Sequence, residues 1–329
     1  MRRRPWLLLC LLLACFLCAA CAAEPEAAAE PASDAAAEPG LPAVEPRLIA
    51  IGHTRGPESA LQQALQQADR WLRRESGGSL GFELYPDAQL GGDAELLSLV
   101  YAGLLPIALP RAAVWAEIER DAEDWPQWSA DWQAAAVFDL PWLYDDAEQA
   151  VAAARALETA IAPYLGPEIL RLDYFSAASH ALVNSERALA APGDAAGLVF
   201  ASSRSMQELP VNRRLSAQTW QYRHYQIADA LGAGQATAAA APLAEIAGQG
   251  WAEHAPWLYL AGRQYEICAV AVNAAWYQGL AEGERQLLAQ ALARMTQSMP
   301  ALAEAEEAAL LERLAAAGAA VRLVGAETD

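Results

Sequence analysis

The segment from Arg47 to Pro110 alternates between strand-like and helix-like stretches, and this alternation limits the fold more than any other feature. "RLIAIGH" is a first apolar strand, and residues 59–74 place leucines and alanines at helical spacing. "GGSLGFELYP" and "LLPIALP" are two more strands, with a helix over 94–102 between them. A third strand that is short and apolar on both faces is typical of a parallel sheet. The order predicts an α/β lobe.

The stretch "QLGGDAELL" (89–97) joins the second strand to the second helix. Its glycine pair is compatible with two interpretations. Asp93 is the cap of the helix after a tight turn, or the exposed amides at the helix start hold an anion. The cap is the commoner arrangement in proteins.

The rest of the chain continues the α/β pattern. Strands are predicted at 169–174, in "GLVFAS" (197–202) and at 267–272, with a weak strand after "ALGAG". Helices are predicted over 147–161, near Ser205, over 282–298 and over 300–317. No internal repeat is visible.

The first 46 residues predict export and anchoring rather than a folded domain. Three arginines precede an apolar run, Trp6 to Leu17, that is too short to cross a bilayer, so residues 1–20 are interpreted as a signal peptide. "CAACAAEPE" resembles the lipobox of bacterial lipoproteins with Cys21 as the lipidated residue, although Cys18 stands where that motif usually has leucine; Cys15 is the weaker alternative. Residues 21–46, rich in Ala, Pro and Glu, form a tether. We expect a periplasmic or cell-surface protein, lipid-anchored to a bacterial membrane.

Charge and cysteine usage narrow the function further. The formal net charge is −19, and it becomes more negative without the arginines of the leader, which opposes nucleic-acid binding. Cys268 is the one cysteine beyond Cys21 and lies in the apolar run "ICAVAVN", so we expect a buried small hydrophobe. No disulfide is then available within the mature chain.

Known catalytic and cofactor motifs are missing from the sequence. It contains no nucleophile elbow, HExxH, CxxC or phosphate-binding loop with lysine, and its four histidines are scattered. We therefore expect no enzyme activity, no cofactor and no metal. The eleven tryptophans are mostly expected in packing, with one or two in a ligand cleft.

The order of segments from Arg47 to Gly325 resembles the solute-binding proteins of TRAP transporters, the DctP-like family. The resemblance rests on the run from "IGHTRGPESALQQ" through "GFELYPDAQLGGDAELLSLVYAG", on "FDLPWLYDD", on "ALAAPGDAAGLVF" and on "ALGAG". It implies a bilobal venus-flytrap fold of two α/β lobes joined by hinge segments. Such a protein captures a small solute by lobe closure and delivers it to separate TRAP membrane subunits. On this basis we assign 47–178 plus 267–305 to lobe I, and 179–266 plus 306–325 to lobe II.

The sequence departs from the family at three ligand-binding positions. The arginine of the family's "iRvp" strand falls on Ala201, a second arginine falls on Ala181, and the asparagine of "DGqEN" falls on Ala241. An arginine side chain holds a carboxylate with two parallel hydrogen bonds, which lysine cannot copy, and an alanine side chain donates no hydrogen bond at all. We therefore expect a solute that is not a simple carboxylate, in an apolar or aromatic-lined pocket.

Other residues are candidates for contacts with the solute. Arg111 and Arg204 could each bring a positive charge back to the ligand cleft; the alternative is that both side chains are solvated. The further candidates lie in the loop after the first strand, at the glycine junction and in an aromatic segment: His53, Thr54, Asp93, Trp220, Tyr222 and His224. The alternative is a surface lipoprotein that has lost its ligand and uses the fold as an interaction or assembly module.

Overall fold

The computed structural model describes residues 46–116, 135–138, 140–141, 143–162, 166–203, 205–260 and 264–323. The predicted signal peptide, Cys21, almost all of the predicted tether, the tryptophan-rich segment at 124–133 and Arg204 lie outside these ranges. The part from Val44 onward forms one compact unit. None of the described helices is both long enough and apolar enough to cross a membrane.

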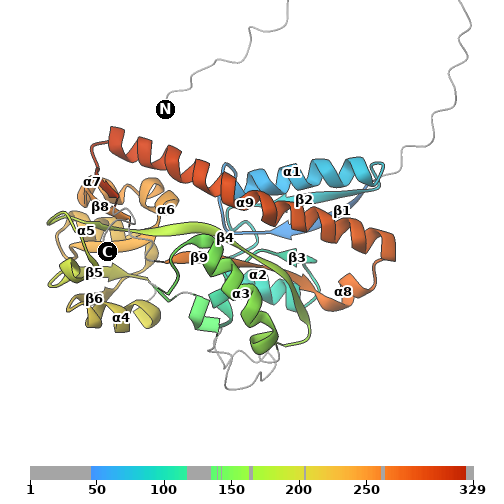
Figure 1. Ribbon diagram of the computed structural model, residues 1–329, viewed down its shortest axis with the longest axis horizontal. Helices are drawn as coiled ribbons and strands as arrows, with labels where there is room; N and C mark the ends of the chain where they lie inside the picture. The colour runs from blue at the N-terminus through green and yellow to red at the C-terminus, as the bar shows by residue number, and fades with distance from the viewer. Residues whose placement is uncertain are drawn as a thin grey trace, which may run out of the picture. The chain divides into compact units, whose positions relative to one another are not determined.

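The described residues form ten strands that alternate with helices (Figure 1). The strands are β1 Arg47–Gly52, β2 Leu80–Tyr85, β3 Ile107–Ala108, β4 Ile169–Asn184, β5 Val199–Ser202, β6 Gln218–Gln221, β7 Ala238–Pro242, β8 Trp257–Leu260, β9 Tyr265–Asn273 and β10 Ala320–Leu323. The α-helices are α1 Ala60–Glu75, α2 Asp93–Tyr101, α3 Ala147–Ile161, α4 Ser205–Arg214, α5 Ile227–Gly232, α6 Leu243–Gly248, α7 Trp251–His254, α8 Ala274–Gln278 and α9 Glu282–Ala316. Short 3₁₀ helices are η1 Ala112–Ala116, η4 Pro192–Ala195 and η5 His224–Gln226.

Two sheets share the long strand β4. From Ile169 to Ser179 it pairs antiparallel with β9 in the sheet that also contains β1, β2 and β3. From His180 to Asn184 it pairs with β7 and β8 in the second sheet, which also contains β5, β6 and β10. Figure 1 shows β4 running from one group of strands into the other. The predicted bilobal α/β fold is confirmed by this arrangement and by the structural comparisons below.

The first sheet is covered on both faces, which explains its apolar strands. One face packs with α1 and α9 around Ile49 and Ile51, and the other packs with α2, α3 and η1. Helix α1 begins at the predicted place because Ser59 accepts a hydrogen bond from the Gln62 amide. Helix α3 has the bounds that the sequence predicts, 147–161, and Asp146 caps it in the same way.

Two predictions about elements are wrong. The stretch 104–110 contributes only the two residues of β3, Leu104 is 75% exposed, and the sheet is mixed because β9 runs antiparallel to β3. The helices predicted over 282–298 and 300–317 are one helix, α9, with Pro300 inside it. Tertiary contacts on both sides of the proline offset the lost backbone hydrogen bond: Met295 and Met299 are buried, and Glu306 accepts from the Ala60 amide.

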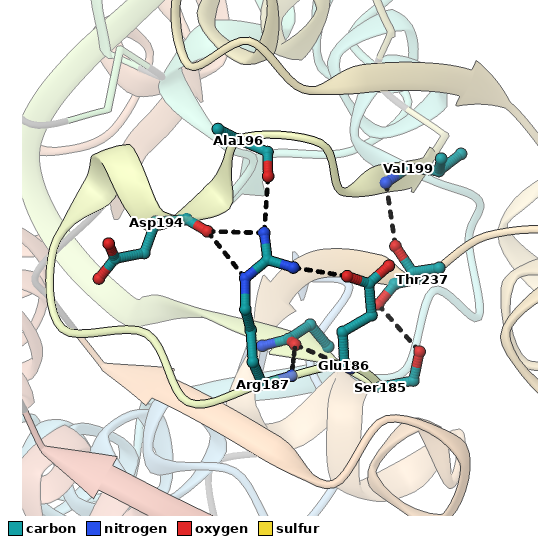
Figure 2. Close-up of polar contacts among 8 residues, drawn as sticks. Ser185, Glu186, Arg187, Asp194, Ala196, Val199 and Thr237 are labelled. Atoms are coloured by element: carbon teal, nitrogen blue, oxygen red, sulfur yellow. Dashed lines mark hydrogen bonds and ion pairs between the residues drawn. The ribbon is translucent and has the colours of Figure 1, made fainter.

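An arginine organises the connection from β4 to β5. The Arg187 guanidinium donates to the Asp194 carbonyl from Nε at 3.3 Å and from Nη2 at 3.0 Å, and to the Ala196 carbonyl at 2.6 Å (Figure 2). The Asp194 carboxylate accepts from the amides of Ala190 and Ala191. These bonds satisfy the loop backbone and fix the start of the strand that carries Ala201.

Candidate functional site

Two arginine–carboxylate pairs meet beside the point where β4 changes sheets. Arg55 pairs with Glu266, and Arg111 Nε donates to Asp93 Oδ2 at 2.9 Å. The side chains of Arg111 and Asp93 are 10% and 9% exposed, and those of Arg55 and Glu266 are 17% and 5% exposed. Burial at this level is tolerated for charged groups when each has an opposite charge at contact distance. We refer to these four residues as the charge cluster.

The fold brings the charge cluster together from four segments. Arg55 lies three residues past β1, and its carbonyl accepts from the Asp87 amide at 2.7 Å. Asp93 is the first residue of α2, and Arg111 follows β3 and forms a bridge to Cys268 of β9. Arg55 and Arg111 therefore lie past the carboxyl ends of neighbouring parallel strands, where α/β proteins bind ligands.

The glycine junction supports this arrangement but does not cap the helix as predicted. Gly92 is the residue that precedes α2, and Asp93 lies inside the helix without a capping hydrogen bond. The Asp93 carboxylate instead contacts Arg111 and accepts from the Thr54 hydroxyl at 3.4 Å. Gly91 has φ 109°, and a Cβ there would lie 2.6 Å from the Glu95 Cβ, so glycine is required at this position. The cap interpretation of Asp93 is therefore wrong.

His53 lies two residues before Arg55 and is fully buried. Its Nε2 is 2.8 Å from the Gln62 Oε1, whereas its Nδ1 has no hydrogen-bond partner in the described structure. Burial lowers the pKa of His53 below its usual 6.5; the hydrogen bond to Gln62 acts in the opposite sense, and the nearby Arg55 charge adds to the lowering. A neutral imidazole at neutral pH follows.

Glu266 and His180 mark the change of sheets. Glu266 lies opposite Ala178 in the ladder between β9 and β4, next to a register shift. Its second carboxylate oxygen is 3.7 Å from His180 Nε2. Because β4 leaves β9 at this point, both side chains lie where the first sheet ends.

Cys268 is buried, as predicted, at 3% exposure. Burial is the main cause of a raised thiol pKa, and the Glu266 charge raises it further, while Arg55 and Arg111 oppose the change. The thiol therefore stays protonated.

The three alanines that the resemblance places at ligand-binding positions lie together in an apolar core. Ala181 of β4 faces Ala241 of β7 in the ladder, and Ala201 lies in β5, which pairs with β7. They are 0%, 2% and 1% exposed, in one apolar cluster with Trp251 and side chains from α5, α6 and α9. At these positions the chain offers packing surface and no side-chain hydrogen bond.

The predicted aromatic segment lies on the second sheet. Trp220 is on β6 and 51% exposed, and Tyr222 follows this strand and packs against the same apolar cluster as the alanines. His224 Nδ1 is 3.3 Å from a Glu245 oxygen, and its ring centroid is 6.1 Å from that of Trp251. The structure thus groups Tyr222 and His224 near the alanines, and His53, Thr54, Asp93 and Arg111 in and around the charge cluster.

Arg111 is not solvated, contrary to one interpretation of the sequence, because it is buried and paired. From the sequence, neither Arg55 nor Glu266 was singled out as a site residue. A signal for Glu266 was present, since it is the single charged residue in the apolar strand "YEICAVAVN", and an isolated charge there requires a buried partner. Among the described residues, no group of three or more His, Cys, Asp or Glu side chains is arranged to hold a metal ion.

Comparison with known families identifies the chain. The family model described as bacterial extracellular solute-binding protein, family 7 (DctP) matches residues 51–328. The chain belongs to this family. Its members are solute-binding components of transport systems rather than enzymes, and this one is a TRAP-type extracytoplasmic solute-binding protein. A search of curated proteins finds no match.

Solved structures of TRAP periplasmic solute-binding proteins share the fold. A protein from Ochrobactrum anthropi, with its C-terminus bound in the ligand-binding pocket, has 19% identity and a TM-score of 0.74 over 86% of this chain and 85% of its own. The sugar acid binding protein DctPAm from Advenella mimigardefordensis, in complex with galactonate, has 20% identity and a TM-score of 0.67 over 86% and 88%. A protein from Pseudomonas aeruginosa with bound L-malate has 23% identity and a TM-score of 0.68 over 86% and 94%.

We predict that Glu266→Gln strongly destabilises the fold. The substitution leaves the buried Arg55 without its counter-charge, which typically costs about 3–5 kcal/mol. The matched control is Glu75→Gln, since Glu75 pairs with Arg74 on the surface, where such pairs contribute about 0–1 kcal/mol. Urea unfolding of both variants measures the difference, and equal small losses would contradict a structural role for the Arg55–Glu266 pair.

We also predict that His53 makes stability depend on pH. Because the folded-state pKa of His53 lies below 6.5, the unfolded chain binds more protons as the pH falls through that value, and stability is lost on acidification. His53→Gln removes this term, so its unfolding free energy should decline less than that of the wild type between about pH 8 and about pH 5. Carboxyl groups contribute to both curves and cancel in the difference. Parallel curves would show that His53 does not titrate differently in the two states.

Proposed function

We propose that the chain is the lipid-anchored receptor of a TRAP transport system and that its solute is not a simple carboxylate. The single observation that carries this proposal is the neutralisation of Arg55 and Arg111 by the chain's own carboxylates. Relatives of the fold contain galactonate and L-malate, both of which carry a carboxylate. In this chain a carboxylate solute has to compete with Asp93 or Glu266 for an arginine.

The alanines support the same conclusion from the second sheet. Charge-assisted hydrogen bonds contribute roughly 1.5–3 kcal/mol each, and Ala181, Ala201 and Ala241 provide none. An acid placed between the two sheets therefore meets occupied guanidinium groups on one side and gains no side-chain hydrogen bond from these alanines on the other. A solute that carries no uncompensated negative charge avoids both penalties.

Capture is proposed to occur by closure of two lobes. The proposed division into 47–178 plus 267–305 and 179–266 plus 306–325 is supported by the change of β4 partner, which occurs between Ser179 and His180. Strands β4 and β9 and helix α9 are the segments that connect the two parts, and Glu307 of α9 accepts from the Ser179 hydroxyl at 2.8 Å. Closure around a solute in such proteins occurs by φ/ψ changes at a few hinge residues, which we place in these connections. The closed form is expected to be the one that TRAP membrane subunits receive.

A second function is supported by the burial of the alanines. A chain that has replaced polar ligand contacts by core packing is compatible with a surface lipoprotein that binds no solute and serves as an interaction or assembly module. The tryptophan content argues for retained capture, because exposed Trp220 lies on the strand that follows the expected ligand strand β5.

Solute binding separates the two functions. We expect at least one compound of a broad metabolite library to raise the melting temperature or to quench tryptophan fluorescence in a saturable manner. At a hundredfold excess over its Kd, such a ligand adds about 2.7 kcal/mol to the free energy of unfolding. Acids with a net negative charge should be absent from the tight binders. Tight binding of such an acid that is lost in Arg111→Ala would contradict the proposed specificity but support capture, and a library without any binder would favour the interaction module.

The lipid anchor is tested at Cys21. In bacterial cells that express the full chain, we expect incorporation of labelled palmitate and recovery with membranes, and we expect Cys21→Ala to abolish both, because the chains on that residue supply the attachment. Cys15→Ala is the matched control and should keep the label. Loss of the label in Cys15→Ala with retention in Cys21→Ala would place the modification at the earlier cysteine.

A further inference from the structure

We infer that the solute is a small dipolar molecule with one cationic and one anionic group, and that it binds with its cation at Asp93 and its anion at Arg111. The inference rests on the proposed function, because it names the chemical class that such a receptor captures. It depends on the composition, burial and placement of the charge cluster.

The charge cluster is neutral as a whole. It contains two guanidinium groups and two carboxylates, and none of their side chains is more than 17% exposed. Arg111 forms a bridge to Cys268 of β9, and Glu266 lies two residues before Cys268 on the same strand, so the two pairs share one region. A solute with a net charge would add an uncompensated charge to this poorly hydrated region, whereas a dipolar solute adds none.

The Arg55–Glu266 and Arg111–Asp93 pairs have different surroundings. This difference assigns solute binding to the Arg111–Asp93 pair. Glu266 lies within the β9–β4 ladder, and its carboxylate has Arg55 on one oxygen and His180 near the other. This pair holds together the loop after β1 and the end of the first sheet. Arg111 and Asp93 lie instead at the end of β3 and the start of α2, past the strand ends where solutes bind in such folds.

The Arg111–Asp93 pair is itself a template for a dipolar solute. Arg111 Nε and Asp93 Oδ2 are 2.9 Å apart, so a positive and a negative group lie side by side. A dipolar molecule can place its cationic group against the Asp93 carboxylate and its anionic group against the Arg111 guanidinium at the same time. Thr54 fixes the Asp93 carboxylate through its hydroxyl at 3.4 Å. An anion alone would gain Arg111 and be repelled by Asp93, and a cation alone would have the reverse problem.

The experiment compares matched ligands on the full chain in detergent. Isothermal titration calorimetry is performed with the common L-amino acids, with the carboxylic acids that lack their amino groups, and with the amines that lack their carboxyl groups. We expect saturable binding of at least one amino acid. The acid and the amine with the same side chain should bind at least tenfold more weakly.

Variants assign the two ends of the solute. Asp93→Asn should weaken the amino acid at least tenfold and shift preference toward the acid, and Arg111→Gln should shift preference toward the amine. Glu95→Gln is the matched control, because Glu95 is exposed on the same helix and should leave the affinity unchanged. The ligand comparison on the wild-type protein stands by itself if a variant does not fold.

The remaining outcomes overturn the inference in distinguishable ways. An acid that binds as tightly as its amino acid, or an uncharged sugar that binds tightly and does not respond to Asp93→Asn, would overturn the dipolar solute and leave solute capture intact. No saturable binding in any of the three series or by sugars would count against both the inference and the proposed function.

Discussion

The change of partner along β4 is the constraint on which the rest of the structure depends. A single strand of sixteen residues pairs with β9 in one sheet and with β7 and β8 in the other, so the two sheets are joined by continuous backbone hydrogen bonding. Helix α9 follows the same course, packing with α1 over the first sheet and contributing Leu314 to the core of the second. Side chains next to the point where β4 changes partner are therefore positioned by both sheets.

Charges at this point are retained because they neutralise one another. Arg55, Glu266, Arg111 and Asp93 come from four separate segments, and each is so poorly hydrated that its charge is costly to bury without a partner. In a binding protein, the same arrangement of charges determines which charged groups on a solute are complementary to the site. On the proposed specificity, guanidinium groups that are already paired disfavour a ligand that brings only another carboxylate, and they favour one that brings a matching pair of charges.

Much of the fold was predictable because local patterns agree with the tertiary structure. The bounds of α3 follow from its Asp146 cap and its alanine-rich helical spacing, and the β1 to β3 region follows from alternation of apolar runs with turn residues. Predictions failed where contacts distant in sequence override local preference. Pro300 remains inside α9 because packing on both sides supports the helix, and β6 and β8 were missed because four residues carry too little periodicity to be recognised.

The sequence by itself determined the family, the α/β class, the absence of polar side chains at Ala181, Ala201 and Ala241, and a buried Cys268, because these follow from residue types and their order. Only the tertiary structure decided that Asp93 pairs with Arg111 instead of capping its helix, and that Arg55 meets Glu266 from more than two hundred residues away. Side-chain pairing across such separations leaves no periodic pattern in the sequence. It is fixed by where the strand ends meet, and this property belongs to the folded sheets.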